Sequence, residues 1–259
     1  MDKLRVSLIQ TDLVWESPIE NHKNFSKLIE STEQTDIIVL PETFNTGFSM
    51  DSERLAEPMA GITMQWMKAE ANKKDAVICG SLIIEEGGEY YNRFIWMEPD
   101  GTFEYYNKRH LFRMGDEHKS FTQGTEKVII EYKGWKICPM ICYDLRFPVW
   151  SRNQKQEYDL LIYVANWPEV RINAWEKLLY ARAIENQCYV ASVNRIGIDG
   201  LGVNCSGSSM LIDPKGYLMD KAPNQKEAVK TISLSLNDLS DFRKKFPVGM
   251  DGDGFNINT

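Results

Sequence analysis

A cysteine stands at an abrupt change of character in the segment PMICYDLRFP (139–148). Cys142 follows an apolar run and precedes a polar stretch that ends at a proline. A thiol with a pKa near ~8.5 is only a few per cent thiolate at neutral pH, so a nucleophilic cysteine needs an adjacent base or a positive field. With such a neighbour, this thiol could attack a carbonyl carbon and form a covalent intermediate.

Two other polar side chains follow β-like runs in the same manner. Glu42 comes after DIIVLP, and Lys108 comes after FEYYN. Ligands usually bind at the carboxyl ends of strands in open α/β sheets, so we expect the three side chains to converge there. Lys108 and the backbone N–H of Tyr143 would stabilise the oxyanion that Cys142 creates. Glu42 would give a proton to departing ammonia and then activate water against the thioester, as in a thiol amidohydrolase.

Each member of this trio also has a purely structural explanation. A glutamate in a turn is usually solvated or caps a helix, and a lysine in NKRHLF is usually surface charge. A cysteine in PMICYDL is more often a packing residue than a nucleophile. Composition and spacing leave both interpretations open.

The five cysteines are odd in number and scattered along the chain. This pattern favours free thiols in a reducing compartment. Cys138 and Cys142 would lie roughly 13 Å apart on one strand, at ~3.3 Å per residue, which is too far to share one metal ion. Because the chain has only three histidines, we expect no metal and no other cofactor.

Short β-rich runs alternate with helical patterns, which predicts an α/β fold. The turn signals EPDGT (98–102) and DPKGY (213–217) predict hairpins, so antiparallel pairs should join the sheets. Strands are predicted at 5–10, 36–40, 76–84, 91–97, 103–106, 128–132, 135–141, 160–164, 188–194 and 209–213. Helices are predicted at 22–31, 63–73, 173–186 and 237–245.

Composition limits the class of protein. The 259 residues are 43% hydrophobic, enough for a sizeable core, and no linker divides them. We expect one domain over 1–259, with a loose or partner-contacting tail at 249–259. A net charge of −7 argues against partners such as nucleic acid or an anionic membrane. No signal peptide or membrane span of ~20 apolar residues is recognisable, so we expect a cytoplasmic protein.

Three segments together resemble the catalytic motifs of the nitrilase superfamily, the Glu-Lys-Cys carbon–nitrogen hydrolases. They are LPETFNTGF (40–48), YNKRHLF (106–112) and CYDLRFPVWSR (142–152), and RAIEN (182–186) and GSSMLIDPKG (207–216) are similar to later family segments. YNKRHLFRMGDEHKSFTQG and VANWPEVR most resemble the bacterial omega-amidase branch, which acts on 2-oxoglutaramate and 2-oxosuccinamate. The resemblance implies an α-β-β-α sandwich, with mixed sheets and helices on the outer faces, and a homodimer or higher homo-oligomer.

The same resemblance implies roles for individual residues. Cys142 matches the nucleophile, Glu42 the general base, and Lys108 the group that stabilises the tetrahedral intermediate. Glu117 aligns with a second glutamate that positions substrate or holds the lysine, although an exposed loop charge is the alternative. We expect Asp144 and Arg146 to brace the turn after the nucleophile.

The substrate implied by the resemblance is a small amide with a carboxylate at its far end, so the pocket should offer a cation. The candidate cations are Arg113, Arg146 and Arg195. The expected pocket walls are Phe112, Tyr143, Asn166 and Trp167. A carbamoylase, an aliphatic nitrilase or a deaminated-glutathione amidase would keep the trio and change only the pocket. A non-enzymatic oligomeric scaffold is a remote alternative.

Overall fold

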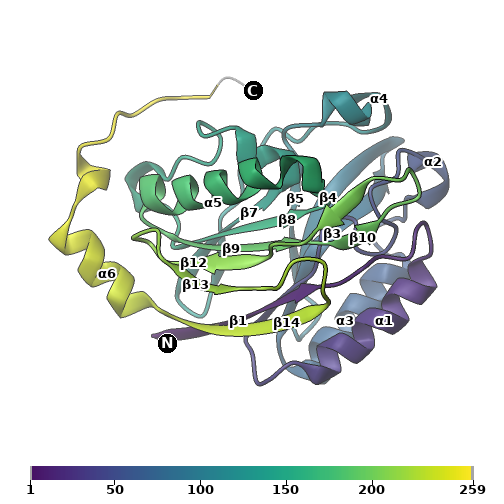
Figure 1. The fold of residues 1–259 in the computed structure, drawn as a ribbon, viewed down its shortest axis with the longest axis horizontal. Helices are drawn as coiled ribbons and strands as arrows, with labels where there is room; N and C mark the ends of the chain where they lie inside the picture. The colour runs from purple at the N-terminus through teal and green to yellow at the C-terminus, as the bar shows by residue number, and fades with distance from the viewer. Residues whose placement is uncertain (1, 258–259) are drawn as a thin grey trace.

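Two β-sheets packed face to face form the centre of the protein, and helices lie on their outer faces (Figure 1). The structure is a computed structural model that describes residues 2–257. The predicted α-β-β-α sandwich with mixed sheets is confirmed. No helix within the described residues is long and apolar enough to cross a bilayer.

The first sheet has six strands in the order β14-β1-β2-β3-β4-β5. Strands β1, β2 and β3 run parallel, whereas β14, β4 and β5 join by antiparallel pairing. The β4–β5 hairpin confirms the turn predicted at 98–102. The strands are β1 (Lys3–Gln10), β2 (Ile37–Val39), β3 (Val77–Glu86), β4 (Glu89–Met97), β5 (Phe103–Asn107) and β14 (Ala228–Ser235).

The second sheet has the order β13-β12-β9-β8-β7-β6. Its three central strands, β7, β8 and β9, are parallel, and the β12–β13 pair confirms the hairpin predicted at 213–217. A two-stranded ribbon, β10 (Ile196–Ile198) with β11 (Asn204–Ser206), follows β9. The strands of the sheet are β6 (Ile130–Tyr132), β7 (Trp135–Ile141), β8 (Leu160–Ala165), β9 (Tyr189–Asn194), β12 (Met210–Ile212) and β13 (Leu218–Lys221).

The helices divide between the two outer faces. Buried side chains of α1 and α3 pack against the first sheet, and those of α5 pack against the second. Figure 1 shows α1 beside α3 on one side of the sandwich and α5 on the other. The α-helices are α1 (Pro18–Ser31), α2 (Ser52–Leu55), α3 (Ile62–Lys74), α4 (Glu117–Ser120), α5 (Ile172–Asn186) and α6 (Leu236–Lys245). Five 3₁₀ turns are η1 (Arg113–Gly115), η2 (Cys142–Arg146), η3 (Gln154–Gln156), η4 (Glu169–Arg171) and η5 (Val248–Met250).

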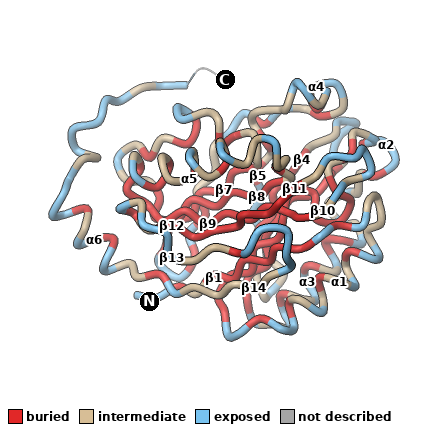
Figure 2. The backbone as a smooth tube through the Cα atoms, viewed as in Figure 1, coloured by how far each residue is buried: buried red, intermediate tan, exposed pale blue. Residues whose placement is uncertain are grey.

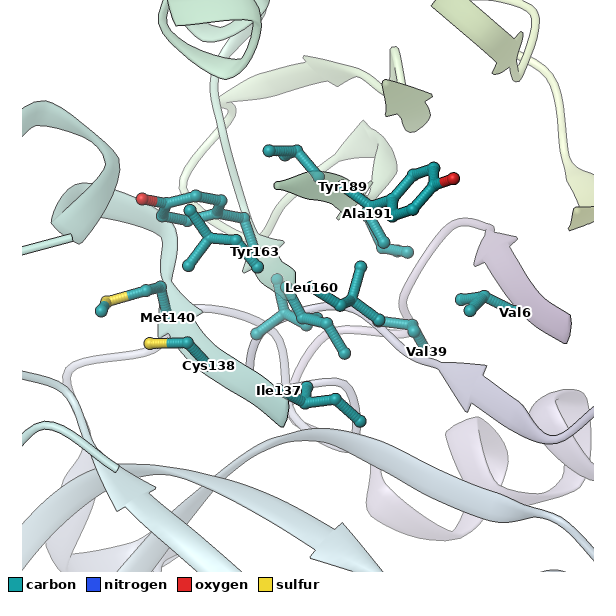
Figure 3. Packing of buried hydrophobic residues seen from close by; sticks show 14 of the residues in the cluster. Val6, Val39, Ile137, Cys138, Met140, Leu160, Tyr163, Tyr189 and Ala191 are labelled. Atoms are coloured by element: carbon teal, nitrogen blue, oxygen red, sulfur yellow. The ribbon is translucent and has the colours of Figure 1, made fainter. Parts of the chain in front are cut away.

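Alternation along the strands places one set of side chains between the sheets. In β2, Ile37 and Val39 face the second sheet, whereas Ile38 packs with the helices, because successive strand residues point to opposite faces. Figure 3 shows Val39 near Leu160 of β8 in this inner layer. The central strands of both sheets are mostly buried, whereas β5, β13 and β14 are largely half-buried or exposed, as are the outer helix faces and loops (Figure 2).

Every predicted strand and helix is present, with small shifts at its ends. The largest shift is in α1, which begins at Pro18 because proline suits the first turn of a helix. The prediction missed the short elements β10, β11, α2 and α4. It also missed β14, an edge strand that pairs with β1 and whose residues are mostly half-buried. A half-buried edge strand carries a weak apolar pattern, so its partner along the sheet defines it.

Candidate active site

The strand β7 delivers Cys142 to a tight turn. Cys142 begins η2 with a backbone φ of +43°, a left-handed conformation that costs energy for a residue with a Cβ. Asp144 holds the turn: its carboxylate accepts hydrogen bonds from Ile141 N (3.1 Å), Tyr106 Oη (2.8 Å) and His110 N (2.9 Å). The predicted bracing role of Asp144 is confirmed, and the turn leaves the Cys142 side chain on the wall of a pocket.

A buried ion cluster stands beside this turn. Lys108 follows β5, and its Nζ donates to Glu42 Oε1 at 2.7 Å and to Glu117 Oε1 at 2.9 Å. All three side chains have 0% exposure. Glu117 lies in the short helix α4, where its Oε2 also accepts from Phe112 N at 2.6 Å. The alternative of an exposed loop charge at Glu117 is therefore wrong.

Two asparagines complete the contacts of the Glu42 carboxylate. Asn92 in β4 donates its Nδ2 to Glu42 Oε1 (2.9 Å) and to Glu117 Oε1 (3.1 Å). Asn166 follows β8 and donates its backbone N–H to Glu42 Oε2 at 2.8 Å. The sequence predicted Asn166 at this edge but missed Asn92, because nothing distinguishes an asparagine inside a strand until the partner across the sheet is known.

Burial and charge act in opposite directions within the cluster. Burial lowers the pKa of Lys108, but Glu117 and Glu42 outweigh it and raise that pKa, so the ammonium is charged at neutral pH. Burial also raises the pKa of Glu117, and the nearby charge of Glu42 adds to the effect. The pKa of Cys142 is raised well above its ordinary value, first by burial and then by the charge of Glu42, while Lys108 acts in the opposite direction. The thiol therefore needs a proton acceptor in order to react near neutral pH.

A pocket of about 510 Å³ opens above Cys142. Four residues predicted to form its walls do line it, and several more, Phe48 among them, come from separate loops. The predicted wall residues that it contains are Phe112, Tyr143, Asn166 and Trp167.

Two of the three predicted candidate cations are wrong. Arg113 begins the exposed turn η1 and does not line the pocket. Arg195 is fully buried, and its guanidinium pairs with Asp12 and donates to Ile196 O. The turn and the ion pair direct these two side chains elsewhere, which spacing along the chain could not reveal.

The third candidate, Arg146, lines the pocket. Its guanidinium makes no hydrogen bond to another described residue, so its predicted role as a brace of the turn is wrong. Its Cζ lies 5.0 Å from the centre of the Trp167 ring. Arg171 of η4 lines the same pocket. The sequence did not predict this role, although Arg171 is the last residue of the motif VANWPEVR. Among residues 2–257, no group of three or more His, Cys, Asp or Glu side chains is placed to hold a metal ion.

The geometry agrees with comparisons to known proteins. A family model described as carbon-nitrogen hydrolase matches residues 5–244. The chain belongs to the carbon-nitrogen hydrolases. This carbon-nitrogen hydrolase is thus an enzyme that cleaves carbon–nitrogen bonds, as the sequence motifs predicted. The matched range contains Glu42, Lys108, Glu117 and Cys142.

Relatives of this carbon-nitrogen hydrolase match along nearly the whole chain. It is 45% identical over 255 residues to "Omega-amidase YafV" of Yersinia enterocolitica, and the aligned region covers 98% of this chain and 99% of the relative. It is 32% identical over 251 residues to "2-oxoglutaramate amidase" of Bacillus subtilis (strain 168), covering 95% and 96%. The crystal structure of XC1258 from Xanthomonas campestris, a CN-hydrolase superfamily protein with an arsenic adduct in the active site, matches with a TM-score of 0.97, 42% identity and 100% coverage of both chains.

Proposed function

We propose that this protein is an omega-amidase, which releases ammonia from the terminal amide of 2-oxo dicarboxylic acid monoamides such as 2-oxoglutaramate and 2-oxosuccinamate. The main support is one arrangement: the charges of the Glu42–Lys108–Glu117 cluster act on Cys142, and Cys142 lines a pocket that also carries two arginines. The names of the relatives that are 45% and 32% identical support the substrate class.

The first half of the proposed reaction forms a thioester. The sulfur of Cys142 attacks the amide carbon while Glu42 accepts the thiol proton. Negative charge collects on the former carbonyl oxygen, where the Lys108 ammonium and the backbone N–H of Tyr143 stabilise it. The carbon–nitrogen bond then breaks, Glu42 returns the proton to the leaving nitrogen, and ammonia departs.

The second half releases the acid. Water attacks the thioester carbon while Glu42 accepts a proton from it, and a second tetrahedral oxyanion forms at the same position. The carbon–sulfur bond breaks, and the sulfur of Cys142 recovers a proton from Glu42. Glu117 acts through its hydrogen bond to Lys108, which keeps the ammonium beside Glu42.

The first test measures ammonia release by the purified protein and by Cys142→Ala. The panel contains 2-oxoglutaramate, 2-oxosuccinamate, an aliphatic nitrile, an N-carbamoyl amino acid and deaminated glutathione. We expect turnover of the two keto-amides and its loss in the variant. Preference for another panel member would retain the thiol mechanism and overturn the substrate. Full turnover by a folded Cys142→Ala protein would overturn the mechanism.

We also propose that the chain is one domain and assembles at least as a homodimer. The outer face of α5 carries Ile184 with 54% exposure, a suitable surface for a second copy. The segment after α6 runs along the outside of the molecule (Figure 1), where Phe255 N donates to Gln154 Oε1 at 3.2 Å. The predicted tail, 249–259, is largely exposed where it is described, and its last two residues lie outside the described range. Light scattering at several concentrations tests the assembly.

The cytoplasm remains our proposed location. All five cysteines are free, and four are buried in the protein. Unpaired thiols persist in a reducing compartment. Fractionation of cells that express the tagged protein tests this proposal.

A further inference from the structure

Two arginines are the only basic side chains that line the pocket above Cys142, within the described part of the chain. Arg146 ends η2, the turn that Cys142 begins, and Arg171 ends η4. Both residues are half-buried. They reach one pocket from separate loops, so their meeting there is a property of the fold.

An aromatic ring supports each guanidinium. The Arg146 Cζ lies 5.0 Å from the centre of the Trp167 ring, and the Arg171 Cζ lies 5.3 Å from that of Phe112. The Trp167 ring is itself fixed, because its Nε1 donates to Arg171 O at 2.8 Å. Phe112 is tied to the ion cluster by its backbone N–H, which donates to Glu117. Stacking on fixed rings orients a guanidinium and leaves its edge N–H groups available.

Neither guanidinium has a hydrogen bond or an ion pair with another described residue. Two arginines of the interior, by contrast, form ion pairs: Arg195 with Asp12, and Arg243 with Asp159. The N–H groups of the two pocket arginines are therefore available to donate hydrogen bonds to a ligand.

The two carboxylates that line the same pocket already have other partners. Glu169 accepts from Asn204 Nδ2 at 2.6 Å and from Gln225 Nε2 at 3.1 Å. Asp199 Oδ1 accepts from two backbone N–H groups of its own loop, each at 2.8 Å. These contacts hold the acidic groups in the pocket wall and leave the two arginines facing the cavity without an internal counter-ion.

The placement of thiol and cation suits a short dicarboxylic chain. Cys142 and Arg146 stand at the two ends of the five-residue turn η2 and line the same pocket. The far carboxylate carbon of an extended five-carbon acid lies roughly 5 Å from the amide carbon, given C–C bonds of ~1.5 Å. A chain of this length can place its amide carbon at Cys142 while its far carboxylate stays within the same pocket.

We propose that Arg146 and Arg171 together bind the carboxylate end of the substrate and make the enzyme selective for acidic amides over neutral ones. This inference rests on the proposed function. A guanidinium presents paired N–H groups that match the two oxygens of a carboxylate. The two arginines hold the chain so that its amide carbon lies at Cys142.

The test compares Arg146→Gln and Arg171→Gln with Arg113→Gln, an exposed arginine outside the pocket. For each pocket variant, KM for 2-oxoglutaramate should rise about 10- to 100-fold, as expected for a lost charge-assisted hydrogen bond, while kcat changes less than about threefold. Turnover of butyramide, which lacks the carboxylate, should change little. Arg171→Lys should recover part of the loss because it keeps the charge. Arg113→Gln should behave as the parent protein does.

A binding measurement separates failure of this inference from failure of the proposed function. Calorimetry of 2-oxoglutarate with Cys142→Ala, alone and combined with each Arg→Gln change, reports carboxylate binding without turnover. Weaker binding in both pocket variants supports the inference even if another amide is the preferred substrate. Parental affinity and parental KM in folded variants would overturn it. Circular dichroism identifies any variant that fails to fold, and Arg→Lys then replaces it.

Discussion

At the beginning of β8, Asp159 pairs with Arg243, whereas at its end Asn166 contacts Glu42 beside Lys108. The first cluster is balanced: Arg243 Nη1 lies 2.7 Å from Asp159 Oδ1, and its other nitrogens donate to Gln187 O and Tyr158 O. One cation therefore meets one anion, and main-chain oxygens accept the remaining donors.

The second cluster is unbalanced, because one ammonium meets two carboxylates, all with 0% exposure. A buried excess of negative charge is costly, and the raised pKa of Glu117 expresses that cost. Buried charge therefore has two different roles in this protein. The balanced pair ties α6 to the sheet, and the unbalanced cluster keeps a proton acceptor close to a thiol.

The substitution Glu42→Gln tests most directly whether the unbalanced cluster supplies the proton acceptor. We expect kcat to fall about 100- to 10,000-fold, because proton transfer in both half-reactions is lost. Alkylation of Cys142 by iodoacetamide at pH 7.5 should instead become severalfold faster, since the charge of Glu42 raises the pKa of the thiol. Ammonia release and mass spectrometry measure the two effects. Slower alkylation would show that Glu42 activates the free enzyme's thiol more than it restrains it.

At the balanced end, Arg243→Met should act on stability alone. Removing one member of a buried pair leaves Asp159 without a counter-ion and should lower the free energy of unfolding by about 3 kcal/mol. Turnover per folded molecule should stay within about twofold of the parent. Urea unfolding gives the stability, and Arg243→Met/Asp159→Asn is the control that should recover part of the loss. A large fall in kcat without unfolding would show that the Asp159–Arg243 pair also contributes to catalysis, which would contradict its purely structural role.

Asp36, which precedes β2, is a third buried carboxylate, and its contribution to stability should depend on pH. Burial by itself raises the pKa of its carboxyl, but hydrogen bonds from Arg5 and Lys133 outweigh burial and lower the pKa from 3.8 to about 2. The folded protein thus binds fewer protons than the unfolded chain between these values, so this stability is present above pH 4 and is lost as pH falls toward 2. About 2 kcal/mol is at stake. Urea unfolding at several pH values from 2 to 5 gives the free energy of unfolding as a function of pH. This free energy should fall less steeply toward low pH in Asp36→Asn than in the parent protein.

The smallest effect is expected at Asn92, whose Nδ2 contacts both carboxylates of the unbalanced cluster. Asn92→Leu should lower kcat/KM about tenfold, the effect of roughly 1.4 kcal/mol from one lost positioning contact. The acidic limb of the kcat/KM profile should also move to higher pH, because ionised carboxylates lose a donor. An unchanged profile with reduced stability would make Asn92 a packing residue only.

Much of the active-site end could be predicted because catalysis needs particular residue types at strand ends. Glu42, Lys108 and Cys142 each follow a β-like run, and the flanking motifs are distinctive enough to indicate the family. The same reasoning failed for Arg113 and Arg195, since a side chain's direction depends on turn geometry and on partners far along the chain. Arg195 pairs with Asp12, which is 183 residues away.

The sequence alone predicted most of the strands, four of the helices, the hairpins and the candidate trio, because strand periodicity, turn chemistry and local motifs are properties of short segments. Only the tertiary structure decided that Glu117 is buried against Lys108, that Asn92 joins two carboxylates, and that Arg146 and Arg171 share one pocket. These contacts join separate loops and both sheets. Their energies depend on burial and on distance in space, which no local pattern records.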